Sequence, residues 1–398
     1  MKKMNRTLLV IGIIFIAFNL RPALTSVGPL IGFIRTDLGI SNGTAGFITT
    51  LPLLSFAIIS VLAPRISRTY GNERTIFFGL FILFIGIIIR SLGYIPTVFL
   101  GTLLIGVGIA VGNVLLPSLV KLKFPDKVGI MTSTYTTALS TFAALGSGII
   151  VPLAQGMSLG WKAALASWAV IAVIAMIIWF PQLRETSVRK PVENIPSGNK
   201  GLWSSALAWQ VTFFIGLQSF LFYCTIAWLP AILESHGMSL TLAGWILSIM
   251  QLAGLPATFM TPVIAERFRH QKGIVLFLGI LHLVGLFGLI YIGNTILLIA
   301  AVICIGVAQS ASFSLALTFI GLRTTDAKQA ANLSGMSQSI GYLLAAIGPS
   351  LIGYLFDQTH SWTIPLFVLA IINVMLTVAG IGAGRNQYVF REPLKKIS

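Results

Sequence analysis

Charged residues are scarce in this sequence. Only 9% of its 398 residues are Asp, Glu, Lys or Arg, and just ten of them are acidic. A soluble domain carries roughly 25% charged residues, so this chain cannot cover a water-facing surface. Hydrophobic residues make up 56% of the chain. The composition therefore excludes a soluble globular protein and predicts an all-α integral membrane protein.

Reactive and ligand-binding groups are also rare. Cys224 and Cys304 are the two cysteines, and both lie inside apolar runs without the spacing of a metal or redox site. The sequence contains no phosphate-binding loop, no metal-spaced His/Cys cluster and no nucleophile–base pair. We therefore expect no catalytic residues, no cofactor and no metal. A membrane enzyme or sensor is the hypothesis of another class, and these absences disfavour it.

The apolar runs are long enough to cross a bilayer, because a spanning helix needs about 20 residues. The sequence predicts twelve transmembrane helices, at 7–34, 43–64, 75–93, 95–120, 128–155, 161–181, 206–233, 240–264, 272–292, 295–320, 331–356 and 361–384. Together they use nearly the whole chain, so no separate soluble domain is expected.

The 26 basic residues give a formal net charge of +16. They lie between apolar runs, and most fall on one side if the amino terminus is inside, which is the usual asymmetry of cytoplasmic loops. The pattern predicts that both termini are cytoplasmic and that the protein is a multi-pass component of the inner (plasma) membrane. The partners expected are the lipid bilayer and a small-molecule solute, with no nucleic acid.

The two halves of the chain resemble each other. Ser41, Ala45, Gly46 and Pro64 recur in order as Ser239, Ala243, Gly244 and Pro262. Such parallel repeats are typical of transporters. We predict two pseudo-symmetric six-helix bundles, at 1–181 and 206–398, joined by a cytoplasmic linker at 182–205 that is rich in Pro and Gly. The second bundle ends in a short cytoplasmic tail.

Two loops resemble the signature of the major facilitator superfamily, P-x-x-A-D-R-x-G-R-R. After span 2 the chain reads Pro64-Arg-Ile-Ser-Arg68-Thr-Tyr-Gly71-Asn-Glu-Arg74, with Arg68 at the position of the usual Asp. After span 8, Glu266-Arg267 keeps the acid–Arg pair but lacks the Gly. The resemblance implies a monomeric alternating-access carrier whose inner gate involves Arg68, Gly71, Arg74, Glu266 and Arg267.

Other segments resemble the cyanate/2-nitroimidazole transporter branch of that superfamily. They are Asn-Leu-Arg-Pro-Ala-Leu-Thr at 19–25, Gly-Ile-Ala-Val-Gly-Asn-Val-Leu-Leu-Pro at 108–117 and Gly-Trp-Lys-Ala-Ala-Leu at 160–165. The resemblance implies a small anion or a planar polarised solute such as cyanate or a nitroimidazole.

Arg21 is the main candidate for binding that solute. It lies near the centre of the first span, where an Arg costs about 2.5–3.5 kcal/mol on insertion scales unless it faces protein or water. All ten acidic residues lie at span ends or in loops. An embedded cation without an embedded anion is suited to bind an anionic or strongly dipolar ligand, although backbone carbonyls could also satisfy it.

Further candidates come from the spans that line the cavity in the superfamily fold. We expect the solute to contact Asn113, Gln218, Tyr223 and Gln309, although an interhelical hydrogen bond is the more common role for any one of them. Pro22, Gly28 and Pro29 are candidate hinges of span 1. His282 is expected at the periphery, and Arg90 is expected to extend to the membrane surface.

The sequence thus predicts a secondary or facilitative transporter anchored by Arg21. The alternative is a multidrug exporter of hydrophobic compounds. Export of cationic drugs typically uses an embedded carboxylate, and the spans contain none.

Overall fold

A computed structural model of the chain describes residues 6–124, 128–185, 202–324 and 327–389, and throughout these ranges the regular elements are helices. Twelve helical segments are long and apolar enough to cross a membrane. This confirms the predicted fold class of twelve membrane helices.

Seven spans are single helices: α4 (Asn42–Tyr70), α5 (Asn72–Ser91), α6 (Ile95–Lys123), α10 (Ala206–Ser235), α13 (Lys272–Tyr291), α14 (Thr295–Leu322) and α16 (Thr363–Ala383). Two more are α7 (Val128–Val151), which continues into a π-turn at Pro152–Gly156, and α15 (Ala327–Thr359). The first span is divided into α1 (Arg6–Asn19), α2 (Pro22–Thr25) and α3 (Val27–Leu38). The sixth is divided into α8 (Gly160–Ala166) and α9 (Trp168–Trp179), followed by a 3-10 turn at Phe180–Glu185, and the eighth into α11 (Leu240–Ala253) and α12 (Leu255–Arg267).

Several predicted span ends were wrong by a few residues. The second span was expected to end at residue 64, but α4 continues to Tyr70 and turns at Gly71, which has φ 86°. Pro64 is therefore inside a helix, where a membrane helix tolerates it. The predicted linker at 182–205 lies largely outside the described residues, so the domain boundaries stay a prediction.

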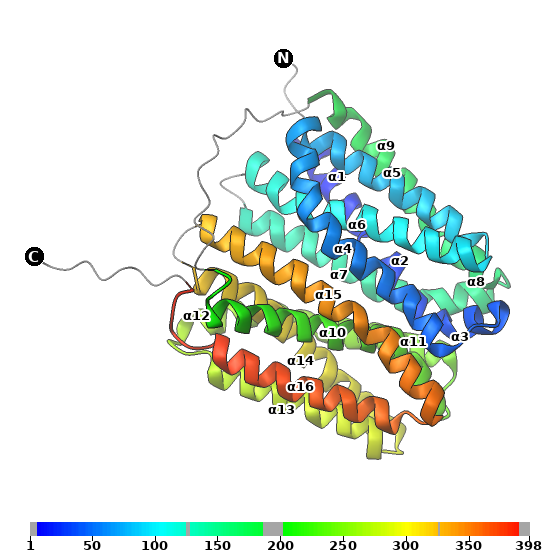
Figure 1. Cartoon of the computed structure of the whole chain (residues 1–398). Helices are drawn as coiled ribbons and strands as arrows, with labels where there is room; N and C mark the ends of the chain where they lie inside the picture. Colours follow the sequence, from blue (N-terminus) through cyan, green and yellow to red (C-terminus); the bar gives the residue numbers. More distant parts are fainter. Residues whose placement is uncertain (1–5, 125–127, 186–201, 325–326, 390–398) are drawn as a thin grey trace, which may run out of the picture.

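The first six spans and the last six form two groups of packed helices (Figure 1). Within the first group α5 packs on α6 and α9, and within the second α13 packs on α14 and α16. The groups meet chiefly where α4 packs on α15 and α7 packs on α11. Figure 1 shows α4 and α15 side by side across this junction.

The repeated residues have matching structural roles. Ser41 and Ser239 are the N-caps of α4 and α11, and each side chain accepts a backbone N–H three residues later. Gly46 and Gly244 lie where these helices cross the other group, because a Cβ on either would come within 3 Å of Pro349 O or Ser147 O. The sequence repeat thus marks two equivalent helix crossings.

Candidate functional site

Arg21 lies at the interruption of the first span. The helix α1 ends at Asn19, Arg21 has φ −133° and ψ −41°, and α2 starts at Pro22. Pro22 lacks an N–H and its ring clashes with a carbonyl one turn back, which explains why the helix breaks here. Broken helices of this kind form the midplane sites of many transporters.

The guanidinium of Arg21 points toward the second group of helices. Its Nη1 lies 3.4 Å from the Tyr223 hydroxyl, and its Cζ lies 5.4 Å from the centre of the Phe222 ring. The side chain is half-buried and forms no ion pair with any residue that the structure describes. The arrangement leaves most of the donors of Arg21 free for a ligand, with an aromatic ring beside them.

Tyr223 is held against Arg21 by a close helix crossing. A Cβ on Gly28 would meet the carbonyl oxygen of Ile226 at 2.1 Å, so α3 and α10 touch backbone to backbone. Gly28 was predicted as a hinge, and the structure shows a packing role for it. Pro22 and Pro29, the other two predicted hinges, are both buried.

Gln218 of α10 and Gln309 of α14 come together where these two helices pack. Gln218 Nε2 donates to the backbone carbonyl of Gln309 at 3.1 Å, and the side-chain Nε2 of Gln309 donates to the Thr225 hydroxyl at 2.8 Å. Both side chains are almost fully buried. They therefore form interhelical hydrogen bonds between α10 and α14.

Asn113, on α6, is half-buried, and no other described residue is its hydrogen-bond partner. Its side-chain amide thus keeps its capacity to bind a solute. Tyr342 of α15 lies close enough to Arg21 and Tyr223 to interact with both electrostatically. The sequence analysis did not select Tyr342, since helix periodicity does not reveal which face of span 11 meets Arg21.

The predicted gate residues lie at the ends of α4, α5 and α12. Arg74, Glu266 and Arg267 are exposed, and Glu266 forms no ion pair with the described residues. Gly71 provides the positive-φ turn between α4 and α5. The side chain of Arg68 lies outside what the structure describes.

The opposite end of α4 is bound tightly to the second group. Asp357 near the end of α15 accepts hydrogen bonds from the backbone N–H groups of Asn42 and Gly43 at 3.2 and 2.8 Å. Further along, Thr50 donates to the carbonyl of Ala346 at 2.7 Å. The two groups are therefore closed together from this end toward the level of Arg21.

Arg90 does not extend to the membrane surface, which corrects the expectation above. It is 1% exposed, and its Nη1 donates to the carbonyl of Ala23 at 2.7 Å. This bond ties α5 to the short helix α2 directly after Arg21. Its Nε and Nη2 have no hydrogen-bond partner in the described part of the chain.

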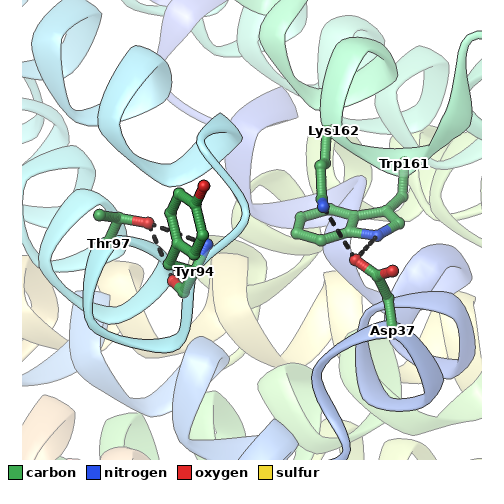
Figure 2. Close-up of polar contacts among 5 residues, drawn as sticks. All are labelled: Asp37, Tyr94, Thr97, Trp161 and Lys162. Atoms are coloured by element: carbon green, nitrogen blue, oxygen red, sulfur yellow. Dashed lines mark hydrogen bonds and ion pairs between the residues drawn. The ribbon is translucent and has the colours of Figure 1, made fainter.

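A polar cluster joins the first and sixth spans at the closed end (Figure 2). Asp37 Oδ2 lies 3.0 Å from Lys162 Nζ and accepts the indole N–H of Trp161 at 3.1 Å. The hydrogen bond from Lys162, with that from Trp161, lowers the pKa of Asp37 below its usual value of 3.8. On α6 nearby in the same view, Thr97 caps the helix start by accepting the backbone N–H of Tyr94 at 3.1 Å.

Comparisons with known proteins give this architecture a family. The model of the Major Facilitator Superfamily matches residues 8–346 and 212–383. The solved structure of the nucleoside transporter NupG is similar in fold, with a TM-score of 0.79 over 94% of this chain and 99% of that one at 15% identity. The chain therefore belongs to the major facilitator superfamily, and it is a transporter rather than an enzyme.

Closer relatives place the chain within the superfamily. The chain is 55% identical to the uncharacterized transporter YycB of Bacillus subtilis, over 100% of this chain and 98% of that protein. It is 41% identical to the 2-nitroimidazole transporter of Escherichia coli, over 97% of both proteins. It is 28% identical to the cyanate transport protein CynX of Escherichia coli, over 86% of this chain and 88% of that protein. These matches confirm the cyanate/2-nitroimidazole transporter branch.

Proposed function

We propose that this carrier moves a small anion or a planar polarised solute of the cyanate or nitroimidazole class by alternating access, with Arg21 as the anchor. The observation that carries the proposal is the half-buried guanidinium of Arg21 at a helix break, without a carboxylate partner among the described residues. A unit charge about 4 Å away gains on the order of 4 kcal/mol at an effective dielectric near 20. A neutral dipole gains less and so binds more weakly.

The surrounding side chains suit a flat solute. The ring of Phe222 and the hydroxyl of Tyr223 border Arg21, so a planar ring can stack while its polar substituent faces the guanidinium. Asn113 supplies a free amide from α6. Gln218 and Gln309 contribute by fixing α10 rather than by meeting the solute first, because their side-chain nitrogens are engaged between helices.

Alternating access requires one end of the carrier to close while the other opens. The contacts at Asp357 and Thr50 close one end, and the exposed residues Arg74, Glu266 and Arg267 lie at the other. With cytoplasmic termini, the closed end is the one that faces the outside of the cell. The rigid-body exchange of these contacts is the transport step that we propose.

The test uses ligand-induced thermal stabilisation of purified protein, since a ligand that binds only the folded state raises apparent stability. The panel contains cyanate, nitrate, 2-nitroimidazole and a hydrophobic cation. We expect the anions and 2-nitroimidazole to stabilise the wild type but not Arg21→Gln. The matched control is Arg269→Gln, which removes an exposed loop cation and leaves the response unchanged.

The multidrug exporter is the competing function. If the hydrophobic cation stabilises the wild type and Arg21→Gln equally, while the anions stabilise neither, the anion proposal is wrong and the exporter replaces it.

A further inference from the structure

His282 occupies the interior of the last six spans, contrary to the peripheral position expected from the sequence. It is 2% exposed, near the middle of α13, and it faces α14 and α16. Of the four histidines, His282 alone lies within a spanning helix. A buried imidazole of this kind is a titratable group that the proposed binding site does not use.

Two side-chain amides flank this imidazole. Gln309 Nε2 of α14 lies 3.4 Å from His282 Nε2. Asn373 of α16 faces the ring, and its Nδ2 donates at 2.9 Å to the carbonyl of Gly279, one turn before His282. The oxygens Gln309 Oε1 and Asn373 Oδ1 are buried and have no hydrogen-bond partner among the residues that the structure describes. Unpaired buried acceptors are rare in folded proteins and call for an explanation.

The number of N–H donors on the imidazole ring explains these unpaired oxygens. A neutral imidazole has one N–H, so it can satisfy at most one of the two amide oxygens, whereas an imidazolium has two N–H groups. A proton on His282 therefore completes the hydrogen bonding of this cluster. We propose that His282, with Gln309 and Asn373, is the proton-binding site of this carrier.

No neighbouring group replaces His282 in this role. Its own helix α13 carries the titratable side chains Lys272 and Tyr291, the packed helix α14 carries Cys304, and the packed helix α16 has none. Beyond Gln309, α10 carries Tyr223, Cys224 and Glu234. The only carboxylate among them, Glu234, is exposed at the end of α10. Histidine is the side chain whose charge changes most readily between about pH 5 and 8.

The cluster is connected to the solute site through α10. Gln309 Nε2 donates to the Thr225 hydroxyl, which itself donates to the carbonyl of Leu221 at 2.8 Å. When His282 Nε2 gains a proton, the new N–H needs an acceptor, and the Gln309 amide must turn its oxygen toward the ring. That rotation withdraws the amide N–H from Thr225. Protonation thus changes the hydrogen bonds of the helix that carries Tyr223.

The inference deepens the proposed function, because it assigns the ion that is coupled to solute movement, and one of its tests needs no solute. Protein carrying ¹³Cε1-labelled histidine gives four imidazole signals, and His282→Gln identifies one of them. We expect that signal to move from the chemical shift of the neutral ring toward that of the charged ring as the pH is lowered. If the His282 signal keeps the chemical shift of a neutral ring wherever the protein is folded, the proton site does not exist.

Asn373→Leu provides a second variant, in which the histidine is retained. Removing one of the two acceptors disfavours the imidazolium, so the charged signal of His282 should appear only at lower pH than in the wild type. An unchanged titration of His282 in Asn373→Leu would show that Asn373 does not bind the imidazolium form of His282, and it would overturn the cluster as proposed.

The coupling is tested in proteoliposomes with 2-nitroimidazole and cyanate as probes. An imposed pH gradient should drive accumulation by the wild type but not by His282→Gln, while exchange at equal pH on both sides persists in the variant. Gradient-driven accumulation that survives in His282→Gln refutes the coupling role. If neither probe is transported, the proposed function fails and the histidine titration decides the proton site by itself.

Discussion

The carboxylate of Asp357 accepts a hydrogen bond from the side-chain amide of Asn42 at 2.6 Å, across the junction between the two groups of six spans. The same carboxylate accepts the first two backbone N–H groups of α4. An anion from one group therefore caps a helix of the other, where the helix dipole favours negative charge. This contact fastens the closed end of the carrier.

Asp357→Ala should open that end. Hydrogen bonds to a charged group contribute roughly 1.5–3 kcal/mol each, so the loss of even one raises the open population by about tenfold. The measurement is the rate of maleimide labelling at Thr50→Cys, a position 4% exposed in the closed junction, in a background without Cys224 and Cys304. Glu234→Ala, which removes an exposed carboxylate at the end of α10, should leave the rate unchanged. Equal labelling rates in Asp357→Ala and the wild type would contradict this account.

Gly28 and Gly32 offer a matched pair on one helix. A Cβ at Gly28 would lie 2.1 Å from a backbone oxygen of α10, whereas a Cβ at Gly32 has nothing within 4 Å. We expect Gly28→Ala to lower stability by about 1–3 kcal/mol, the usual cost of overpacking. Gly32→Ala should be neutral or slightly stabilising, because Ala favours a helix. Thermal unfolding in detergent distinguishes the two, and similar melting of both variants would show that α3 and α10 do not cross so closely.

The spans were predictable from the sequence because bilayer thickness fixes their length and the hydropathy of the chain shows their position. Their interruptions were less visible. Pro22 indicated the break beside Arg21, and Pro256 follows the break at Gly254 in the same way, but Pro230, Pro262 and Pro349 lie inside helices that continue through them. The outcome depends on what packs against each position, which is a property of the folded chain.

The site was predictable in part, for a related reason. An Arg inside an apolar run must face protein or water, so Arg21 stood out from composition alone. Gln218 and Gln309 were selected because their spans line the cavity in the superfamily, but the rotation of each helix turns both side chains into the α10–α14 contact. His282 was undervalued for the same reason, since its span number says nothing about which face it occupies.

The Asp37 cluster should make stability depend on pH in the acid range. Its folded-state pKa is lowered by Lys162 and Trp161, so the contribution is present above the usual value of 3.8 and is lost as the pH falls through the folded pKa. Asp37→Asn should therefore melt slightly below the wild type at neutral pH and together with it once the pH has fallen through the folded pKa of Asp37. The effect is small, because the ion pair is about half exposed. A difference that stays constant down to the lowest pH would refute the assignment to Asp37.

Two buried arginines should respond oppositely to replacement by Met. Arg323 is 2% exposed, and its guanidinium donates to the carbonyls of Ala383 and Leu322 and to the side chain of Gln271. Arg90 is equally buried but has one partner, the carbonyl of Ala23, and two unpartnered nitrogens.

Arg323→Met leaves several buried acceptors without a donor, and we expect a loss of roughly 3 kcal/mol or more. Arg90→Met loses one bond of about 1.5–3 kcal/mol, but it also removes two buried nitrogens without partners, each of which costs about 1–3 kcal/mol. Its stability should therefore lie near that of the wild type or above it. Thermal unfolding of the two variants side by side measures the difference. If Arg90→Met loses as much thermal stability as Arg323→Met, the charge of Arg90 is satisfied in the folded protein. The bond to Ala23 is then not its main interaction.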